Sequence, residues 1–374
     1  MIEILKEKQE NRGKGAYLVG IQEPGDIHKK AVEHLSELKD LVRSLGHEIT
    51  GEEIVTVREP RPHYFIGSGK AEEISAKAKA ESASFIVIDH DLTPSQQRNW
   101  EKMSELPTID RQEVIIDIFA ERASTKEAVI QVELARLQYM LPRLARAWSH
   151  LSRQKGGAMG TRGEGEQQIE IDRRIIKQKI AHYQKELTQV VQRRAVQRKQ
   201  RIKGDIPHAA IVGYTNTGKS TLLNTLTGSS VIVEDKLFAT LDPTTRQIKL
   251  PDNQLLLLTD TVGFVRKLPH TLVDAFKSTL EEAVLTDFLI HVVDISNPYF
   301  EEQSLTTLSV LEELGASQKD IITVFNKIDS LDDPLIRRRV EVLNPDAVFI
   351  SAQKGDGIDK LILAIQHKIE DRIQ

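Results

Sequence analysis

The chain has 374 residues, of which 40% are hydrophobic, and it carries a net charge of −4 and no cysteine. This length predicts two or three domains, and the apolar content suffices for real cores. The absence of cysteine excludes disulfides, thiolate metal sites and thiol catalysis. No apolar run reaches the roughly 18 residues of a membrane span, and the N-terminus lacks the apolar segment of a signal peptide, so we expect a cytoplasmic protein.

Charge is distributed unevenly along the chain. Residues 142–203 hold 16 Lys and Arg against 5 Asp and Glu, a net +11, and the remainder of the chain carries −15. A basic segment in an acidic chain favours a polyanion partner, nucleic acid above all. A solvated, charged helix face is the alternative interpretation.

Residues 1–120 alternate between strand and helix patterns, which predicts an N-terminal α/β domain with a parallel sheet. Strands are expected at Tyr17–Ile21, Ile54–Val57 and Phe85–Asp89, and helices at Ile27–Leu45, Ala71–Ala80 and Pro94–Met103. The glycine-containing segment Gly67–Lys70 is either the turn that starts a helix or a small anion-binding turn, and it lacks the lead of a true P-loop.

Residues 121–203 carry two apolar seams with alternating spacings of four and three. The seams are Ile130, Leu134, Leu137, Leu141, Leu144, Trp148 and Leu151, and then Ile176, Ile180, Tyr183, Leu187 and Val190. Such seams predict two helices that pack on each other, and Pro142 should kink the first helix or begin a new one. The Gly-rich segment 155–168 cannot be helical throughout, so we expect an antiparallel helical hairpin with a tip loop.

The tip and the second helix of this hairpin supply candidate RNA contacts. These are Arg153, Lys155, Arg162, Arg173 and Arg174. Basic residues on a Gly-rich loop can settle on a phosphate backbone or in a narrow RNA cavity. A plain connector is the alternative for the loop.

Residues 206–374 predict a doubly wound α/β domain, a fold that binds its ligand at the carboxyl ends of the strands. Expected strands are Ala209–Gly213, Arg246–Leu250, Leu255–Thr259, Phe288–Val293, Ile321–Phe325 and Ala347–Ser351. Expected helices are Lys219–Thr227, Leu272–Val284, Phe300–Leu314, Pro334–Val340 and Ile358–Asp371.

The segment His208–Thr221, HAAIVGYTNTGKST, follows the first of these strands and opens a helix. It fits the P-loop pattern G-x-x-x-x-G-K-[ST]. Backbone N–H groups of such a loop surround a phosphate chain, and the helix N-terminus adds a favourable dipole. Lys219 is expected to reach the β- and γ-phosphates, and Ser220 to hold Mg²⁺.

Four later motifs lie at strand ends or in loops, and one of them, Ser351-Ala352, ends the last strand and would support the base through backbone N–H. Thr240, in LFATLDPTTR, can swing to Mg²⁺ when a γ-phosphate is present, with Thr244 and Thr245 as rivals. In DTVG, Asp260 would bind Mg²⁺ through water, and the Gly263 N–H would meet the γ-phosphate. In NKID, Asp329 would accept hydrogen bonds from guanine N1–H and N2–H₂, donors that adenine lacks, which disfavours an ATPase.

The nucleotide-binding site predicted from these motifs includes further residues beside the ones discussed above. The nucleotide-binding set is Gly213, Tyr214, Thr215, Asn216, Thr217, Gly218, Lys219, Ser220, Thr221, Phe238, Ala239, Thr240, Leu241, Asp242, Asp260, Thr261, Val262, Gly263, Asn326, Lys327, Asp329, Ser351, Ala352 and Gln353. Lys219, Thr240 and Gly263 are the candidate catalytic residues. Ser220, Thr240 and Asp260 are the candidate metal ligands.

With these motifs the sequence resembles the translational GTPases of the P-loop class, and within them the HflX family. The narrower resemblance rests on YFIGSGKAEEI, VIDHDLTPSQQRNWE, DIFAERASTKEAVIQVELARL and HLSRQKGGAMGTRGEGEQQIEIDRR. It implies an N-terminal α/β domain, a long helical hairpin and a C-terminal G domain. It also implies a GTP-dependent factor that binds the large ribosomal subunit through rRNA and can separate the subunits. We expect a monomer.

One position departs from the signalling GTPases, which place a water-orienting Gln directly after DTVG. Here the residue is Phe264, which cannot hydrogen-bond a water, so intrinsic hydrolysis should be slow. Asn216 matches the P-loop Asn of potassium-activated GTPases. K⁺ near Asn216, or the ribosome, is therefore a candidate for the missing charge, and a plain turn residue is the alternative for Asn216.

Two functions follow from the sequence. The first is a GTPase switch that docks on the large ribosomal subunit and splits or rescues ribosomes. The alternative is a regulatory GTPase that acts on a protein partner without RNA.

Overall fold

The computed structural model describes residues 14–144, 162–202, 206–228, 237–238, 241–269, 272, 275–276, 284–316 and 318–373. They pack into two compact units. The first holds the described residues up to Glu121 and those from Val132 to Lys185, and the second holds Arg122–Gln131 and the described residues from Glu186 onward. The residues of the expected hairpin therefore divide between the two units. In the described part of the chain, no helix has both the length and the apolarity needed to cross a membrane.

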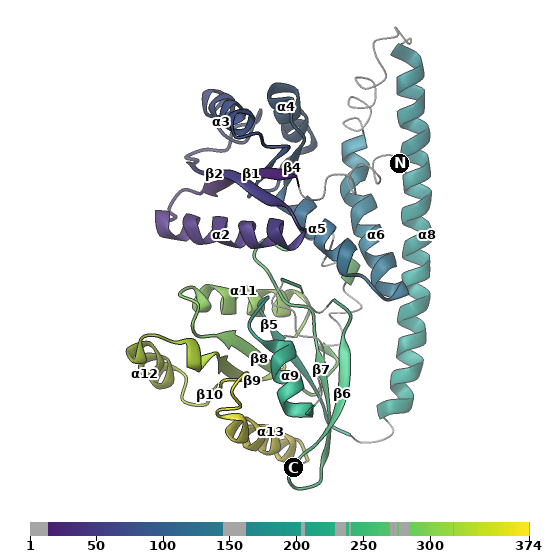
Figure 1. The fold of residues 1–374 in the computed structure, drawn as a ribbon. Helices are drawn as coiled ribbons and strands as arrows, with labels where there is room; N and C mark the ends of the chain where they lie inside the picture. Colours follow the sequence, from purple (N-terminus) through teal and green to yellow (C-terminus); the bar gives the residue numbers. More distant parts are fainter. Residues whose placement is uncertain are drawn as a thin grey trace. The chain divides into compact units, whose positions relative to one another are not determined.

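The first unit is built on a parallel four-stranded sheet in the order β2-β1-β3-β4. Its strands are β1 Gly15–Gln22, β2 Glu48–Thr56, β3 Phe85–Ile88 and β4 Thr108–Asp110. Its helices are α2 His28–Ser44, α3 Ser68–Ala80, α4 Pro94–Ser104 and α5 Arg111–Arg122. Figure 1 shows α2 on one face of this sheet and α3 and α4 on the other. Every residue of β3 is buried, as expected for a strand covered on both faces.

The predicted hairpin helices are present. The first is α6, Lys126–Met140, followed by a 3₁₀ turn, η1 Leu141–Arg143, and the second is α8, Arg162–Ile202. The change of helix type at Pro142 is the break that the sequence predicts. Leu137 and Leu144 form an apolar core with Ile176, so the two seams pack on each other. Residues Trp148 and Leu151 of the first seam and residues 155–161 of the Gly-rich segment lie outside the described residues. The prediction of a tip loop over 155–168 is wrong for residues 162–168, which belong to α8.

The second unit contains a six-stranded sheet in the order β10-β9-β8-β5-β7-β6, in which only β6 is antiparallel to its neighbour. Its strands are β5 His208–Gly213, β6 Thr244–Lys249, β7 Leu255–Asp260, β8 Phe288–Asp294, β9 Asp320–Asn326 and β10 Val348–Phe349. Its helices include α9 Lys219–Thr227, α11 Phe300–Glu313, α12 Pro334–Leu343 and α13 Ile358–Ile373, with the 3₁₀ turn η2 Ile328–Ser330. The predicted α/β class is confirmed. The helix expected at Leu272–Val284 falls largely outside the described residues.

Two apolar cores flank this second sheet. The helices α9 and α13 share one core with the sheet, through Leu222 and Leu361 among others. The helices α11 and α12 share the other, through Phe300 and Val340. Because the chain leaves the central strand β5 first toward β7 and later toward β8, the carboxyl end of β5 is a topological switch point, where such sheets bind ligands.

A buried polar cluster holds the end of α6 to the first sheet. Arg143 lies 3.3 Å from Asp110 at the end of β4 and donates from Nε to Gln97 at 2.9 Å. The Tyr139 hydroxyl lies 3.0 Å from Asp110 and 3.1 Å from Glu113. Burial, followed by the Glu113 charge, raises the pKa of Asp110 to about 6. The cation of Arg143 therefore compensates a carboxylate that is costly to keep ionised in the interior.

We expect Arg143→Met to destabilise the first unit by about 3–5 kcal/mol, because the change keeps the apolar stem but leaves the Asp110 carboxylate without its cation. Denaturant unfolding followed by the fluorescence of the buried Trp100, in a Trp148→Phe background, would measure the loss. The control is Lys79→Met, which removes an exposed pair with Glu105 and should change little. Equal effects of the two changes would contradict the assigned role of Arg143.

Candidate active site

The P-loop wraps from β5 to α9 through backbone conformations that side chains rarely adopt. Gly218 has a φ of +91° and is the N-cap of α9, and Asn216 has a φ of +59°, which Asn tolerates better than most residues. A Cβ at Gly213 would lie 2.3 Å from the Val292 carbonyl oxygen, and one at Gly218 would lie 2.4 Å from Asn326 Nδ2. Both positions therefore need glycine, because a Cβ would collide with a neighbouring atom and because their positive φ angles suit a residue without a side chain.

Lys219 lies buried beneath this loop, and its ammonium group donates to the Tyr214 carbonyl at 2.6 Å. Burial lowers the pKa of Lys219 to about 8, against the opposing effect of the Asp260 carboxylate. The lysine is thus an under-compensated buried cation, and a phosphate chain at the loop would supply the negative charge that stabilises it.

Ser220 and Asp260 form the candidate metal pair. The Ser220 hydroxyl donates to Asp260 Oδ2 at 2.6 Å, and Asp260 is 2% exposed. The strand register brings these two side chains together, because Asp260 at the end of β7 pairs with Ile211 on β5, the strand that leads into the P-loop. A hydroxyl and a carboxylate are hard oxygen donors of the kind that Mg²⁺ prefers beside phosphates, so the residues present fit this ion.

The segment after DTVG is held to the P-loop by its backbone. Thr215 N donates to the Phe264 carbonyl at 2.7 Å, and Phe264 N donates to the Gly213 carbonyl at 3.1 Å. The Phe264 side chain is 1% exposed and belongs to the core. Two residues on, Arg266 N donates to the Tyr214 hydroxyl at 2.6 Å. No motif or periodicity predicts this role of Tyr214.

The NKID motif acts through two different side chains. Asn326 Nδ2 donates to the Thr217 carbonyl at 2.8 Å, and Asn326 Oδ1 accepts from Ala352 N at 2.9 Å. Asp329 has a side chain that is 12% exposed, and a hydrogen bond from Ser351 lowers the pKa of this carboxyl. Lys327, with a φ of +64°, pairs with Asp294 at 2.7 Å. The loop after β9 therefore presents a carboxylate that favours its ionised form, at the residue for which the sequence predicts a base contact.

A buried histidine under the P-loop was missed by sequence reasoning. His291 lies in β8, where it pairs in register with Val212, and burial followed by the nearby Lys219 charge lowers its pKa to about 4. It is therefore neutral near pH 7. The signal in the sequence is a single polar residue inside the apolar run FLIHVVD.

Several predicted site residues lie away from the P-loop or outside the residues that the structure describes. Ala239, Thr240, Arg153 and Lys155 are outside the described residues, and Arg162 begins α8 but its side chain is not described. Thr244 and Thr245 begin β6, where Thr245 Oγ1 lies 2.8 Å from Thr259 Oγ1. Asp242 accepts a hydrogen bond from Thr125 N, just before α6. Arg173 and Arg174 are exposed on α8.

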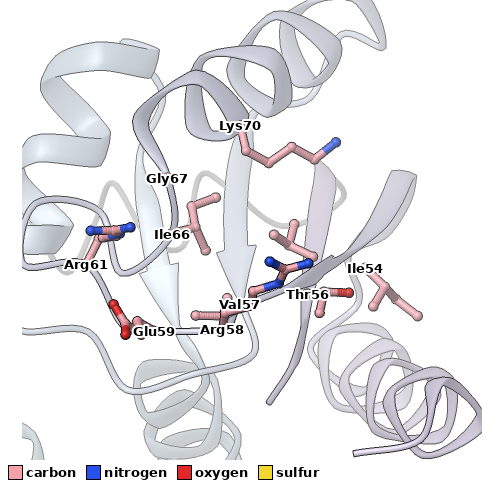
Figure 2. A pocket seen from close by; sticks show the side chains of 10 residues that line it. Ile54, Thr56, Val57, Arg58, Glu59, Arg61, Ile66, Gly67 and Lys70 are labelled. Carbon is pink, nitrogen blue, oxygen red and sulfur yellow. The ribbon is translucent and has the colours of Figure 1, made fainter. Parts of the chain in front are cut away.

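The first unit has a concave region of its own. Figure 2 shows this pocket of about 400 Å³, with Arg58, Arg61 and Lys70 among the residues that line it. Lys70 pairs with Glu53 and, at 3.0 Å, with Glu73, which raise its pKa. Gly67 is the N-cap of α3, so the interpretation of Gly67–Lys70 as a helix start is confirmed. The charge of Lys70 is balanced within the unit, which argues against the anion-binding alternative.

A phosphate loop and an Asn-x-x-Asp loop that share one edge of a doubly wound sheet are the working parts of a P-loop GTPase, and the second unit belongs to this class. Three family models match the chain. They are described as GTP-binding GTPase N-terminal for residues 32–120, GTP-binding GTPase Middle Region for 122–201 and 50S ribosome-binding GTPase for 208–327.

Similar proteins extend this result to nearly the whole chain. GTPase HflX of Escherichia coli K12 is 45% identical over 367 residues, which are 96% of this chain and 84% of that protein. GTPase HflX of Akkermansia muciniphila is 48% identical over 351 residues, 91% of this chain and 80% of that protein. A crystal structure of the complex of SsGBP and GDP is 28% identical, with a TM-score of 0.52 and coverage of 96% and 99% of the two chains. The chain belongs to the GTPase HflX family, and it is a GTPase.

We expect that Phe264→Gln does not increase the rate of GTP hydrolysis, because the side chain at this position points into the core instead of toward a water. Burying an amide there should destabilise the second unit by about 2–4 kcal/mol. Single-turnover hydrolysis and thermal unfolding measure the two effects, with Phe264→Leu as the apolar control. An acceleration above about fivefold in Phe264→Gln would show that the side chain can reach the nucleotide.

Proposed function

We propose that this GTPase binds GTP and GDP at the carboxyl edge of its second sheet and acts on the large (50S) ribosomal subunit, where it splits or rescues ribosomes. The observation that carries the proposal is the basic hairpin of residues 121–203, which packs through Leu137 and Ile176 and leaves Arg173 and Arg174 exposed. The description of the family model that matches residues 208–327 supports it. We place the protein in the cytoplasm as a monomer.

In the proposed phosphate site, the N–H groups of the P-loop and the Lys219 ammonium bind the phosphate chain. Ser220 would hold Mg²⁺ directly and Asp260 through water, and Thr240, which lies outside the described residues, would complete its ligands. When bound, Mg²⁺ neutralises charge on the β- and γ-phosphates. The Gly263 N–H contacts the γ-phosphate, and the absence of a Cβ keeps this approach open, because a Cβ at Gly263 would lie 2.9 Å from Lys219 Nζ.

In the proposed base site, Asp329 accepts from guanine N1–H and N2–H₂, and Ser351, Ala352 and Gln353 complete the wall of the pocket. The Ser351 hydrogen bond supports the ionised state that this contact needs. Asn326 positions the pocket, because its amide bonds both the Thr217 carbonyl of the P-loop and Ala352 N.

The proposed hydrolysis is slow without a stimulant. Phe264 provides no group for the attacking water, so charge or positioning must come from elsewhere. Asn216 is exposed with a left-handed backbone, which supports the role of a turn residue and leaves its amide available to a nearby K⁺. K⁺ and the ribosome are the two stimulants that we propose.

The RNA surface in this proposal runs along α8. A groove of about 760 Å³ is lined there by Arg173, Arg174 and Lys177, with Glu170 and Gln178 beside them. The cations lie on one stretch of helix, which suits the regular spacing of phosphates, and the binding they provide is electrostatic and sensitive to salt.

We expect Asp329→Asn to lower the affinity for GTP by about 100-fold, because two hydrogen bonds to a charged acceptor are lost. The same change should favour xanthosine triphosphate, whose C2 carbonyl can accept from the new amide. Competition against a fluorescent GDP measures both affinities. The control is Asp333→Asn, at the nearby N-cap of α12. An unchanged preference for GTP would remove Asp329 from the base site.

We expect Arg173→Gln with Arg174→Gln to lower the affinity for 50S subunits by about tenfold and to reduce the dependence of log affinity on log salt by about two, since two phosphate contacts are lost. Co-sedimentation with purified subunits at increasing KCl, with GDP or a non-hydrolysable GTP analogue, measures these quantities. The matched control is Arg337→Gln with Arg338→Gln on α12. Equal losses in both variants would point to charge in general instead of α8.

The same assay tests the rival function. Wild-type protein that ignores 50S subunits with either nucleotide, yet retains a protein partner after RNase treatment, would favour the regulatory GTPase that acts without RNA.

A further inference from the structure

Asp242, between the Thr240 segment and β6, is bound to the start of the hairpin. Its Oδ2 accepts from the Ser124 hydroxyl at 2.7 Å and from Thr125 N at 3.2 Å. Its Oδ1 accepts from the Thr125 hydroxyl at 2.5 Å. All three residues belong to the second unit. Two adjacent residues thus place three donors on one carboxylate.

Thr125 is in turn the residue from which α6 starts. Its hydroxyl accepts from Ala128 N at 3.2 Å, and its carbonyl accepts from Val129 N at 3.0 Å. The N–H of Ala128, the Thr125 hydroxyl and the Asp242 carboxylate form a chain in which each hydrogen bond polarises the next. A carboxylate at this place also meets the positive end of the helix dipole. The first turn of α6 is therefore capped by a residue from the GTPase core.

Asp242 is also close to the nucleotide machinery along the chain. Thr244, two residues later, is the first residue of β6 and pairs in register with Asp260, the candidate metal ligand. Thr240, two residues earlier, is the proposed γ-phosphate sensor, and two residues of chain span at most about 7 Å. A shift of Thr240 toward Mg²⁺ must therefore be absorbed at Leu241 or passed on to Asp242.

We propose that Asp242 is the positioning residue that couples the nucleotide state of the GTPase site to the helical hairpin, by capping α6 to a different extent with GTP and with GDP. This inference rests on the proposed role of Thr240. The helix can pass the change on, because Lys126–Gln131 belong to the second unit, and Val132–Met140 of the same helix belong to the first. Leu137, in the latter part, packs against Ile176 of α8.

The test is hydrogen–deuterium exchange of the full chain, loaded with GDP or with a non-hydrolysable GTP analogue and Mg²⁺. In the wild type we expect exchange in the first turn of α6 to differ between the two nucleotides. Ser124→Ala with Thr125→Val should raise exchange there by about five- to tenfold, the effect of losing a cap, and should abolish the nucleotide-dependent difference. The single variant Thr125→Ser keeps the hydroxyl, so its exchange in the first turn of α6 and its nucleotide-dependent difference should match those of the wild type.

The matched control is Asp333→Ala, which removes a carboxylate cap from α12, where Asp333 accepts from Leu335 N at 2.8 Å. It should raise exchange at the start of α12 and leave the nucleotide response of α6 intact. The inference is overturned if α6 exchanges equally with both nucleotides while the segment Gly263–Arg266 responds, or if the double variant keeps the difference. Because this readout needs no ribosome, failure to bind 50S subunits would count against the proposed function alone.

Discussion

The amide of Asn326 joins the phosphate loop to the base loop, and the geometry of the second unit depends on this contact. Parallel register brings the ends of β5 and β9 to one edge of the sheet, with β8 between them. There Asn326 donates to the Thr217 carbonyl and accepts from Ala352 N while being 2% exposed. A buried amide that lost one partner would cost about 1–3 kcal/mol, so both contacts are held together. Gly218 must lack a side chain because this amide occupies the space.

Much of this arrangement can be predicted from the sequence, because local pattern determines it. Residue type and spacing are enough to predict apolar strands such as β3 and β8 and the glycines of the P-loop.

The strand β4 and the helix α5 were not predicted, since β4 has three residues and passes into the helix without a turn residue. The bonding role of Asn326 was also missed, because a motif names residues without showing their partners. The contact of Asp242 spans 117 residues of chain, and no periodicity carries such information. The two compact units divide the single helices α6 and α8, and no sequence pattern marks such a division.

The segment after DTVG is fixed to the P-loop through its backbone, while the Phe264 side chain belongs to the core. Its backbone is bonded to the P-loop on both sides of Phe264, and the Tyr214 hydroxyl accepts from Arg266 N. Three such bonds at about 1 kcal/mol each fix the segment that carries Gly263, for which we propose a phosphate contact. The buried Phe264 ring strengthens the core at the position where a polar side chain would orient water. Electrostatic preorganisation is commonly the largest catalytic contribution, and the lack of this group is the reason for the stimulants proposed above.

The helix α6 is held at its two ends by contacts of unequal strength, which determines where it can respond. At its end, Tyr139 and the neighbouring Arg143 bind the buried Asp110 and Glu113, and disrupting a buried ion pair of this kind costs about 3–5 kcal/mol. At its start, the cap through Thr125 and Asp242 is largely exposed, and such a cap contributes about 1 kcal/mol. A nucleotide-linked shift of that size can release the start of the helix but not its end. In the proposed coupling, the start of α6 is therefore the responsive end, and the end attached to the first sheet is the fixed point.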